Sequence, residues 1–117
     1  MEFVAFIGED KENWGQITAL LNRLEYEKAI IVKNAGEDFS VNERCKVIQV
    51  DSKKTLSELK ENIQSKLKPL LSGDFEVSLS LASGSGKEHM ALLSALLNVP
   101  VGIRLVVYTK DGVQYLS

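Results

Sequence analysis

The sequence is poor in the residues that build metal sites and disulfide frameworks. Among its 117 residues it has one cysteine, Cys45, and one histidine, His89. A lone cysteine cannot close an intrachain disulfide, and a zinc site needs several thiolate or imidazole ligands. Catalysis by Cys45 is not supported, because no Cys/His partner pattern accompanies it. We therefore expect no metal site and no cofactor.

Long hydrophobic runs and a strong net charge are also missing. No apolar run approaches the ~20 residues of a membrane-spanning helix, and no signal peptide opens the chain. The formal net charge is −2, which gives no general attraction to nucleic acid. These absences predict a cytoplasmic protein without membrane contact or direct DNA binding. Any site for an anion must therefore be local.

The composition is that of one globular domain. Hydrophobic residues make up 44% of the chain and charged residues 26%. A chain of this length builds one ordinary core. We expect a single ligand-binding domain over residues 1–117, with no effector domain attached.

Short apolar segments alternate with amphipathic ones. Strands are expected at 3–7, 28–33, 45–50, 75–81, 103–109 and 113–116, and helices from 13, from 55 and at 88–98. A break is expected at 71–74, and Pro100 should stop the last helix. The polar segment 35–44 is short for a parallel crossover, which usually needs a dozen residues and a helix.

This order of elements predicts an α/β fold. Alternating buried strands and amphipathic helices indicate a Rossmann-like three-layer sandwich with a mostly parallel sheet. Lys110-Asp111-Gly112 is typical of a hairpin turn and predicts a C-terminal antiparallel hairpin. At the start of the second helix, Thr55 and Glu58 have the spacing of a capping box.

A glycine-rich turn precedes the last helix, and its spacing excludes two common nucleotide motifs. A phosphate-binding loop of the Walker A type would need glycine at Leu81 and a hydroxyl at Glu88, so a P-loop NTPase is excluded. A dinucleotide fingerprint belongs after the first strand, where Gly8 is followed only by Glu9 and Asp10.

The general mechanism of anion binding does not depend on either motif. Glycines permit close backbone approach, the first turn of a helix offers free amides, and Lys87 adds a positive charge. In the alternative reading, the glycines serve only the backbone angles of a turn and Lys87 is merely solvated. Residue types alone leave both open.

The expected position of two loops favours a ligand-binding site. Ligands of open α/β sheets collect outside the carboxyl ends of strands, where loop 8–10 and loop 83–87 could meet. Glu9 and Asp10 disfavour a strongly anionic ligand, but they can accept hydrogen bonds from sugar hydroxyls or adenine amines; they could equally complement a helix dipole. The candidate ligand-binding residues are Gly8, Glu9, Asp10, Ser83, Gly84, Ser85, Gly86 and Lys87.

Segments 1–8 and 78–90 resemble the CARF domain family, the CRISPR-associated Rossmann fold. The similarity is closest to the N-terminal sensor domain of archaeal CRISPR-associated transcription regulators. In that family the loop after the fourth strand reads Thr-Gly-Gly-Thr-Lys/Arg, one residue, Met. Ser83, Gly84, Lys87 and Met90 match its character. Ser85 and Gly86 stand in exchanged order, with one extra residue before Met90.

The resemblance implies a homodimer whose paired loops line one pocket for a cyclic oligoadenylate second messenger, as a sensor or sequestering module of antiviral defence. One alternative is a metal-independent ring nuclease, with Lys87 stabilising the developing charge and Ser83 or Ser85 orienting it. No general base is evident there, and His89 is the only side chain that titrates near neutrality. A second alternative is a Rossmann-like protein-interaction domain without a small ligand.

Overall fold

The computed structural model describes residues 1–71, 76–99 and 101–117. Its strands are β1 (Glu2–Ile7), β2 (Ala29–Asn34), β3 (Cys45–Val50), β4 (Glu76–Ser80), β5 (Gly102–Thr109) and β6 (Gly112–Tyr115). Its α-helices are α1 (Trp14–Arg23), α2 (Leu56–Leu67) and α3 (Gly86–Leu97). Two short 3-10 turns, Lys11–Asn13 and Lys68–Leu70, flank α1 and α2.

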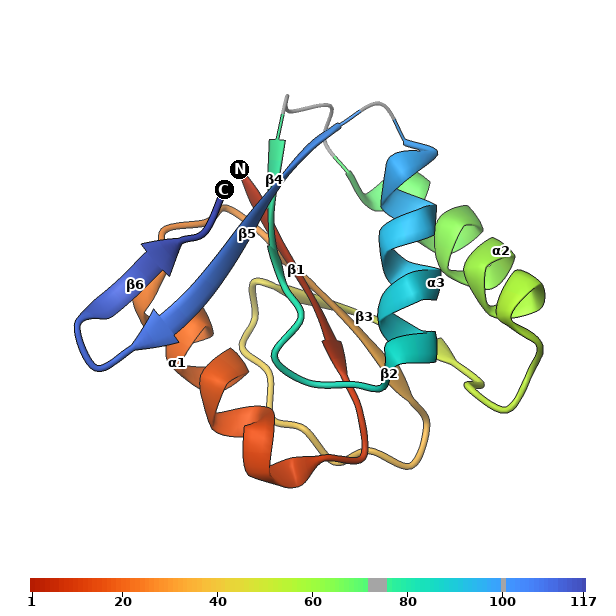
Figure 1. Ribbon diagram of the computed structural model, residues 1–117, viewed down its shortest axis with the longest axis horizontal. Helices are drawn as coiled ribbons and strands as arrows, with labels where there is room; N and C mark the ends of the chain where they lie inside the picture. The colour runs from red at the N-terminus through yellow and green to blue at the C-terminus, as the bar shows by residue number, and fades with distance from the viewer. Residues whose placement is uncertain (72–75, 100) are drawn as a thin grey trace.

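The six strands form one sheet in the order β3-β2-β1-β4-β5-β6 (Figure 1). All neighbouring pairs are parallel except β5 and β6, which form the antiparallel hairpin. The predicted Rossmann-like α/β fold is therefore confirmed. The chain runs outward from β1 to β3 and then returns to β4 on the other side of β1. This places the topological switch point between β1 and β4, where such sheets bind their ligands.

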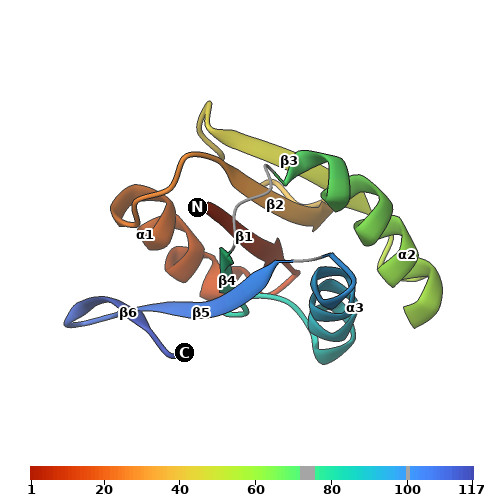
Figure 2. The ribbon, with the colours of Figure 1, turned by 90° about the horizontal axis from the view of Figure 1, so that it is seen from above.

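The helices cover both faces of the sheet. Figure 2 shows α1 on one side and α2 with α3 on the other. β1 lies in the centre and is buried along its whole length, because both faces are covered. One core cluster packs the inward sides of α2 and α3 against the sheet, and a second packs α1 against the opposite face.

The connection between β2 and β3 is a parallel crossover without a helix. Residues 35–44 pass over the α1 side of the sheet, where buried Phe39 belongs to the same core cluster as α1. The Phe39 ring meets Trp14 edge-on, with ring centroids 5.6 Å apart. A single aromatic anchor thus gives the short connection a hydrophobic contact that a crossover helix would otherwise supply.

Some expected boundaries change. α3 begins at Gly86, two residues before the expected start, because Ser85 rather than a later residue caps it. The expected break at 71–74 falls mostly outside the described residues, as do Phe75 at the start of the fourth strand and Pro100 after the last helix. Within the described ranges, no helix is both long enough and apolar enough to cross a membrane.

Candidate functional site

The buried side chain of Ser83 joins the loop after β1 to the loop after β4, and its hydrogen bonds with Gly8 and Asp10 form a latch between the two loops. The Ser83 side chain, which is fully buried, accepts a hydrogen bond from the Gly8 amide at 2.9 Å. Its hydroxyl donates to Asp10 Oδ1 at 2.7 Å. The same Asp10 oxygen accepts from the Gly84 amide at 3.0 Å. Two loops more than 70 residues apart in sequence are therefore joined by three hydrogen bonds at the switch point.

Two glycines make this close approach possible. A Cβ at Gly8 would lie 2.6 Å from the Cα of Gly84, closer than side-chain carbons can come to backbone. Gly84 itself has a φ of 109°, a conformation that residues with a Cβ rarely adopt. These glycines therefore serve the contact between the loops.

The Asp10 carboxylate is held in its charged form. Partial burial alone would raise its pKa, but hydrogen bonds from Asn13, Ser83 and the Gly84 amide outweigh it and hold the pKa below the ordinary value of 3.8. Asn13 Nδ2 donates to the second carboxylate oxygen at 2.8 Å. Both oxygens of Asp10 are thus engaged within the protein.

The start of α3 carries a second internally bonded carboxylate. Ser85 and Glu88 form a capping box, in which Ser85 Oγ accepts from the Glu88 amide and Glu88 Oε1 accepts from the Ser85 amide at 2.8 Å. Only 6% of Glu88 is exposed. Its other oxygen accepts from Ser52 Oγ at 2.5 Å and from Asn34 Nδ2 at 3.2 Å. A single side chain therefore links α3 to β2 and to the loop after β3.

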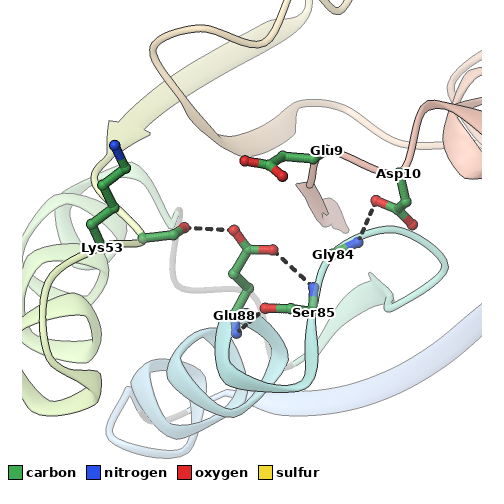
Figure 3. Close-up of a pocket in the computed structure, with 7 residues that line it drawn as sticks. Glu9, Asp10, Lys53, Gly84, Ser85 and Glu88 are labelled. Atoms are coloured by element: carbon green, nitrogen blue, oxygen red, sulfur yellow. Dashed lines mark hydrogen bonds between the residues drawn. The ribbon is translucent and has the colours of Figure 1, made fainter.

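These loops enclose a pocket at the carboxyl ends of the central strands (Figure 3). The pocket has a volume of about 380 Å³ and is lined by Glu9, Asp10, Ser52, Lys53, Gly84, Ser85 and Glu88. A second cavity of about 530 Å³ shares four of these residues and continues along the ends of β2 and β3. The two cavities are therefore neighbours, and the volume of the first lies in the 300–1,000 Å³ range of small-ligand sites.

The predicted site residues divide into three groups around this pocket. Four of them, Glu9, Asp10, Gly84 and Ser85, line it. Gly8 and Ser83 are buried and form the latch between the loops, so they support the pocket without facing it. Gly86 and Lys87 are exposed on the first turn of α3 and do not line it.

Lys87 is engaged by backbone. Its ammonium group donates to the carbonyl oxygens of Ser52 and Lys54, at 2.7 and 2.5 Å. Both carbonyls belong to the loop between β3 and α2. In this structure Lys87 therefore holds that loop against α3, which the sequence did not indicate.

The amides of the glycine turn are partly occupied as well. The Gly84 amide is bonded to Asp10, and the Ser85 amide to Glu88. In the part of the chain that the structure describes, the amides of Gly86 and Lys87 make no hydrogen bond, as expected for the first turn of a helix. Two of the four successive donors are thus open to a ligand.

His89 lies outside the pocket lining. Its Nε2 is 2.7 Å from the Ser83 carbonyl oxygen. A carbonyl can only accept, so Nε2 carries the proton in this contact. The half-buried imidazole thereby supports the backbone of the loop from within α3. Among the residues described, no group of three or more metal-ligating side chains is placed to hold a metal ion.

Sequence reasoning did not identify the wall of the pocket that comes from Ser52, Lys53 and Glu88. One signal was available, because Ser85 and Glu88 have the same spacing as the capping box found at Thr55 and Glu58. The contribution of Ser52 and Lys53 had no comparable signal. It depends on β3 lying at the far side of β2, which brings the end of β3 within reach of α3.

No family model matches the chain, and no curated protein matches it significantly. The resemblance to CARF domains therefore enters only as a proposal.

Proposed function

We propose that the protein is a CARF-like binding module that takes a cyclic oligoadenylate in the pocket at the switch point. One observation carries this proposal: the loops after β1 and β4, which the sequence singled out, lie side by side and line a ligand-sized cavity. This is where doubly wound α/β sheets take nucleotides.

The groups around the cavity suit the parts of an adenylate. The Glu9 carboxylate is exposed on the rim and can accept hydrogen bonds from a ribose hydroxyl or an adenine amine. α3 begins next to the lining residue Ser85, and the dipole of this helix favours an anionic group at that end of the cavity. A polar ligand with both donors and an anionic group fits this mixture better than inorganic phosphate alone.

We further propose that two copies of the chain associate through the exposed face of α3. From Met90 to Leu97 this helix has no charged residue, and these two side chains are 58% and 70% exposed. An uncharged helix face is self-complementary across a twofold axis, because it brings no like charges together. α3 begins at the pocket rim, so such a dimer would bring the two pockets near one another.

Isothermal titration with cyclic tetra-adenylate and cyclic hexa-adenylate tests the ligand. We expect heat of binding for at least one ring, and loss of that heat in Glu9→Trp, which fills the cavity from its rim. Glu12→Trp is the matched control, since Glu12 is exposed nearby and does not line the cavity. Absence of heat with both rings, or equal binding by Glu9→Trp, would reject the ligand proposal.

Sedimentation equilibrium tests the dimer. We expect a dimer for the wild type and a monomer for Leu97→Lys, because a buried unpaired charge opposes association. Thr18→Lys, on the exposed side of α1 across the sheet from α3, is the control and should stay dimeric. A monomeric wild type, with and without cyclic adenylate, would contradict the dimer.

A second candidate is a protein-interaction domain in which the glycine turn is only architecture. The observation that favours it is the occupation of the Gly84 and Ser85 amides by carboxylates of the chain itself. The titration above separates the two functions, since an interaction domain gives no heat with either ring. The ring nuclease gains no such support, because Ser83 is buried and Lys87 is engaged by carbonyls.

A further inference from the structure

Two lysines lie near the pocket, and their surroundings differ. Lys87 is engaged by two backbone carbonyls and does not line the cavity. Lys53 lines the cavity, and among the described residues its ammonium group makes no hydrogen bond or ion pair. Figure 3 shows Lys53 on the opposite side of the pocket from Glu9 and Asp10. The lysine that is open to a ligand is therefore Lys53.

We propose that Lys53 binds the anionic group of the ligand, and that Lys87 is a positioning residue for the loop that carries Lys53. This inference rests on the proposed function and names the residue that would give the site its selectivity for an anion. It moves the phosphate contact from α3, where the sequence pattern suggested it, to the loop between β3 and α2.

The loop around Lys53 is anchored on both sides. The Lys87 ammonium group holds the carbonyls of Ser52 and Lys54, the residues before and after Lys53. Asn34 accepts from the Ser52 amide at 2.7 Å, and Glu88 accepts from the Ser52 hydroxyl. The Lys53 amide donates to Asp51 Oδ1 at 3.0 Å. A backbone fixed in this way presents a charged side chain at low entropic cost on binding.

The charged side chains that line the pocket also differ in how many hydrogen bonds they make within the protein. Asp10 accepts three hydrogen bonds from the protein, and so does Glu88. Among the described lining residues, the charged side chains that make no such bond are Glu9 and Lys53. The pocket therefore offers a cation on one wall and an acceptor on the other. This polarity suits a ligand with a phosphate at one end and hydroxyl or amine donors at the other.

The test measures cyclic tetra-adenylate affinity for Lys53→Ala and its controls at two salt concentrations. Loss of a charge-assisted hydrogen bond predicts an affinity that is weaker by roughly 10- to 100-fold. Lys53→Arg should restore most of the affinity. Lys54→Ala is the matched control, because this neighbouring exposed lysine lines a different groove along α2.

Two readouts separate contact from positioning. Lys53→Ala should bind with a weaker dependence on salt than the wild type, because an exposed charge contact is screened. Its melting temperature should stay within about 2 °C of the wild type, as expected for an exposed side chain. Lys87→Ala should lower the melting temperature, because it releases two carbonyls of the anchored loop, and should keep the salt dependence of the wild type.

The outcomes distinguish this inference from the proposed function. Wild-type binding that Lys53→Ala leaves unchanged would overturn the role of Lys53 and leave the function standing. Loss of salt dependence in Lys87→Ala rather than in Lys53→Ala would overturn the inference in favour of the sequence-based assignment. Binding of pyrophosphate that depends on Lys53, without binding of a cyclic adenylate, would support Lys53 and reject the function. No wild-type binding of either probe would overturn both.

Discussion

The helices α2 and α3 begin with the same four-residue capping box but in different surroundings. Thr55 and Glu58 cap α2, and Ser85 and Glu88 cap α3, with both reciprocal bonds present in each case. Glu58 is exposed and, among the described residues, its carboxylate accepts hydrogen bonds only from Thr55, whereas Glu88 is buried and also accepts from Asn34 and Ser52.

The comparison separates a local motif from a site. A capping box satisfies donors within one turn of helix, which four residues can encode. At α3 the same carboxylate also fixes the neighbouring loop and lines a cavity, because β2 and β3 end beside it. The identical sequence pattern therefore has a structural role at α2 and a structural and site-building role at α3.

The largest expected effect comes from removing the two N3 carboxylates. Glu88→Ala should lower the free energy of unfolding by about 2–4 kcal/mol, because it removes a buried carboxylate together with the hydrogen bonds that it accepts from Ser85, Asn34 and Ser52. Glu58→Ala, the matched change at α2, should cost about 0.3–1 kcal/mol. Urea denaturation measures both. Equal losses would mean that burial does not distinguish the two boxes.

Breaking the latch behind the α3 box should have the next largest effect. Ser83→Ala leaves the buried Gly8 amide without its acceptor and should cost about 1–3 kcal/mol. Ser57→Ala on the exposed side of α2 should change the free energy of unfolding by less than about 0.5 kcal/mol. Melting curves of the two variants give the comparison. A Ser83→Ala variant as stable as the wild type would show that the latch is dispensable.

The capping hydroxyls should behave alike. Thr55 and Ser85 are both exposed, and each accepts from the amide three residues ahead. Replacing either with alanine should cost about 1 kcal/mol. Helix content and urea midpoints of Thr55→Ala and Ser85→Ala test this. A much larger loss for Ser85→Ala would place the difference between the helices in the hydroxyls rather than in the glutamates.

The smallest expected effect is a pH dependence from Asp10. Since its pKa is lowered in the folded state, Asp10 contributes stability that is fully present above the ordinary carboxyl pKa of 3.8 and is lost as the pH falls through the folded value. Asp10→Asn should therefore flatten the loss of unfolding free energy in acid. Unfolding free energies of wild type and variant from neutral pH into acid test this, and identical slopes would contradict it.

Much of the fold follows from local patterns. The apolar run of β1, the stripe of α1 and the capping box of α2 each depend on residues close in sequence, and each was predictable. The start of α3 was placed two residues late, although Ser85 and Glu88 gave the signal for it. The parallel pairing of β2 and β3 across a helix-free loop was not foreseeable, because it depends on the packing of Phe39 against α1.

Only part of the candidate site could be predicted from the sequence. Glycines, serines and acidic residues after β1 and β4 indicated two of its walls, because the order of strands and helices along the chain shows which residues follow the carboxyl end of a strand. The wall of Ser52, Lys53 and Glu88 was missed, as was the engagement of Lys87 by the loop carbonyls. These features join residues 30 or more positions apart, and no spacing rule connects them.

The amino-acid sequence by itself determined the α/β class, the alternation of buried strands and amphipathic helices, the final hairpin and the capping of α2, because these depend on periodicity and short-range hydrogen bonds. Only the tertiary structure decided which charged groups are available at the carboxyl ends of the strands. It assigned the Asp10 and Glu88 carboxylates and the Lys87 ammonium group to internal partners and left Glu9 and Lys53 facing the pocket. The reason is physical: a polar group near buried backbone is satisfied by whichever partner the folded chain brings within about 3 Å.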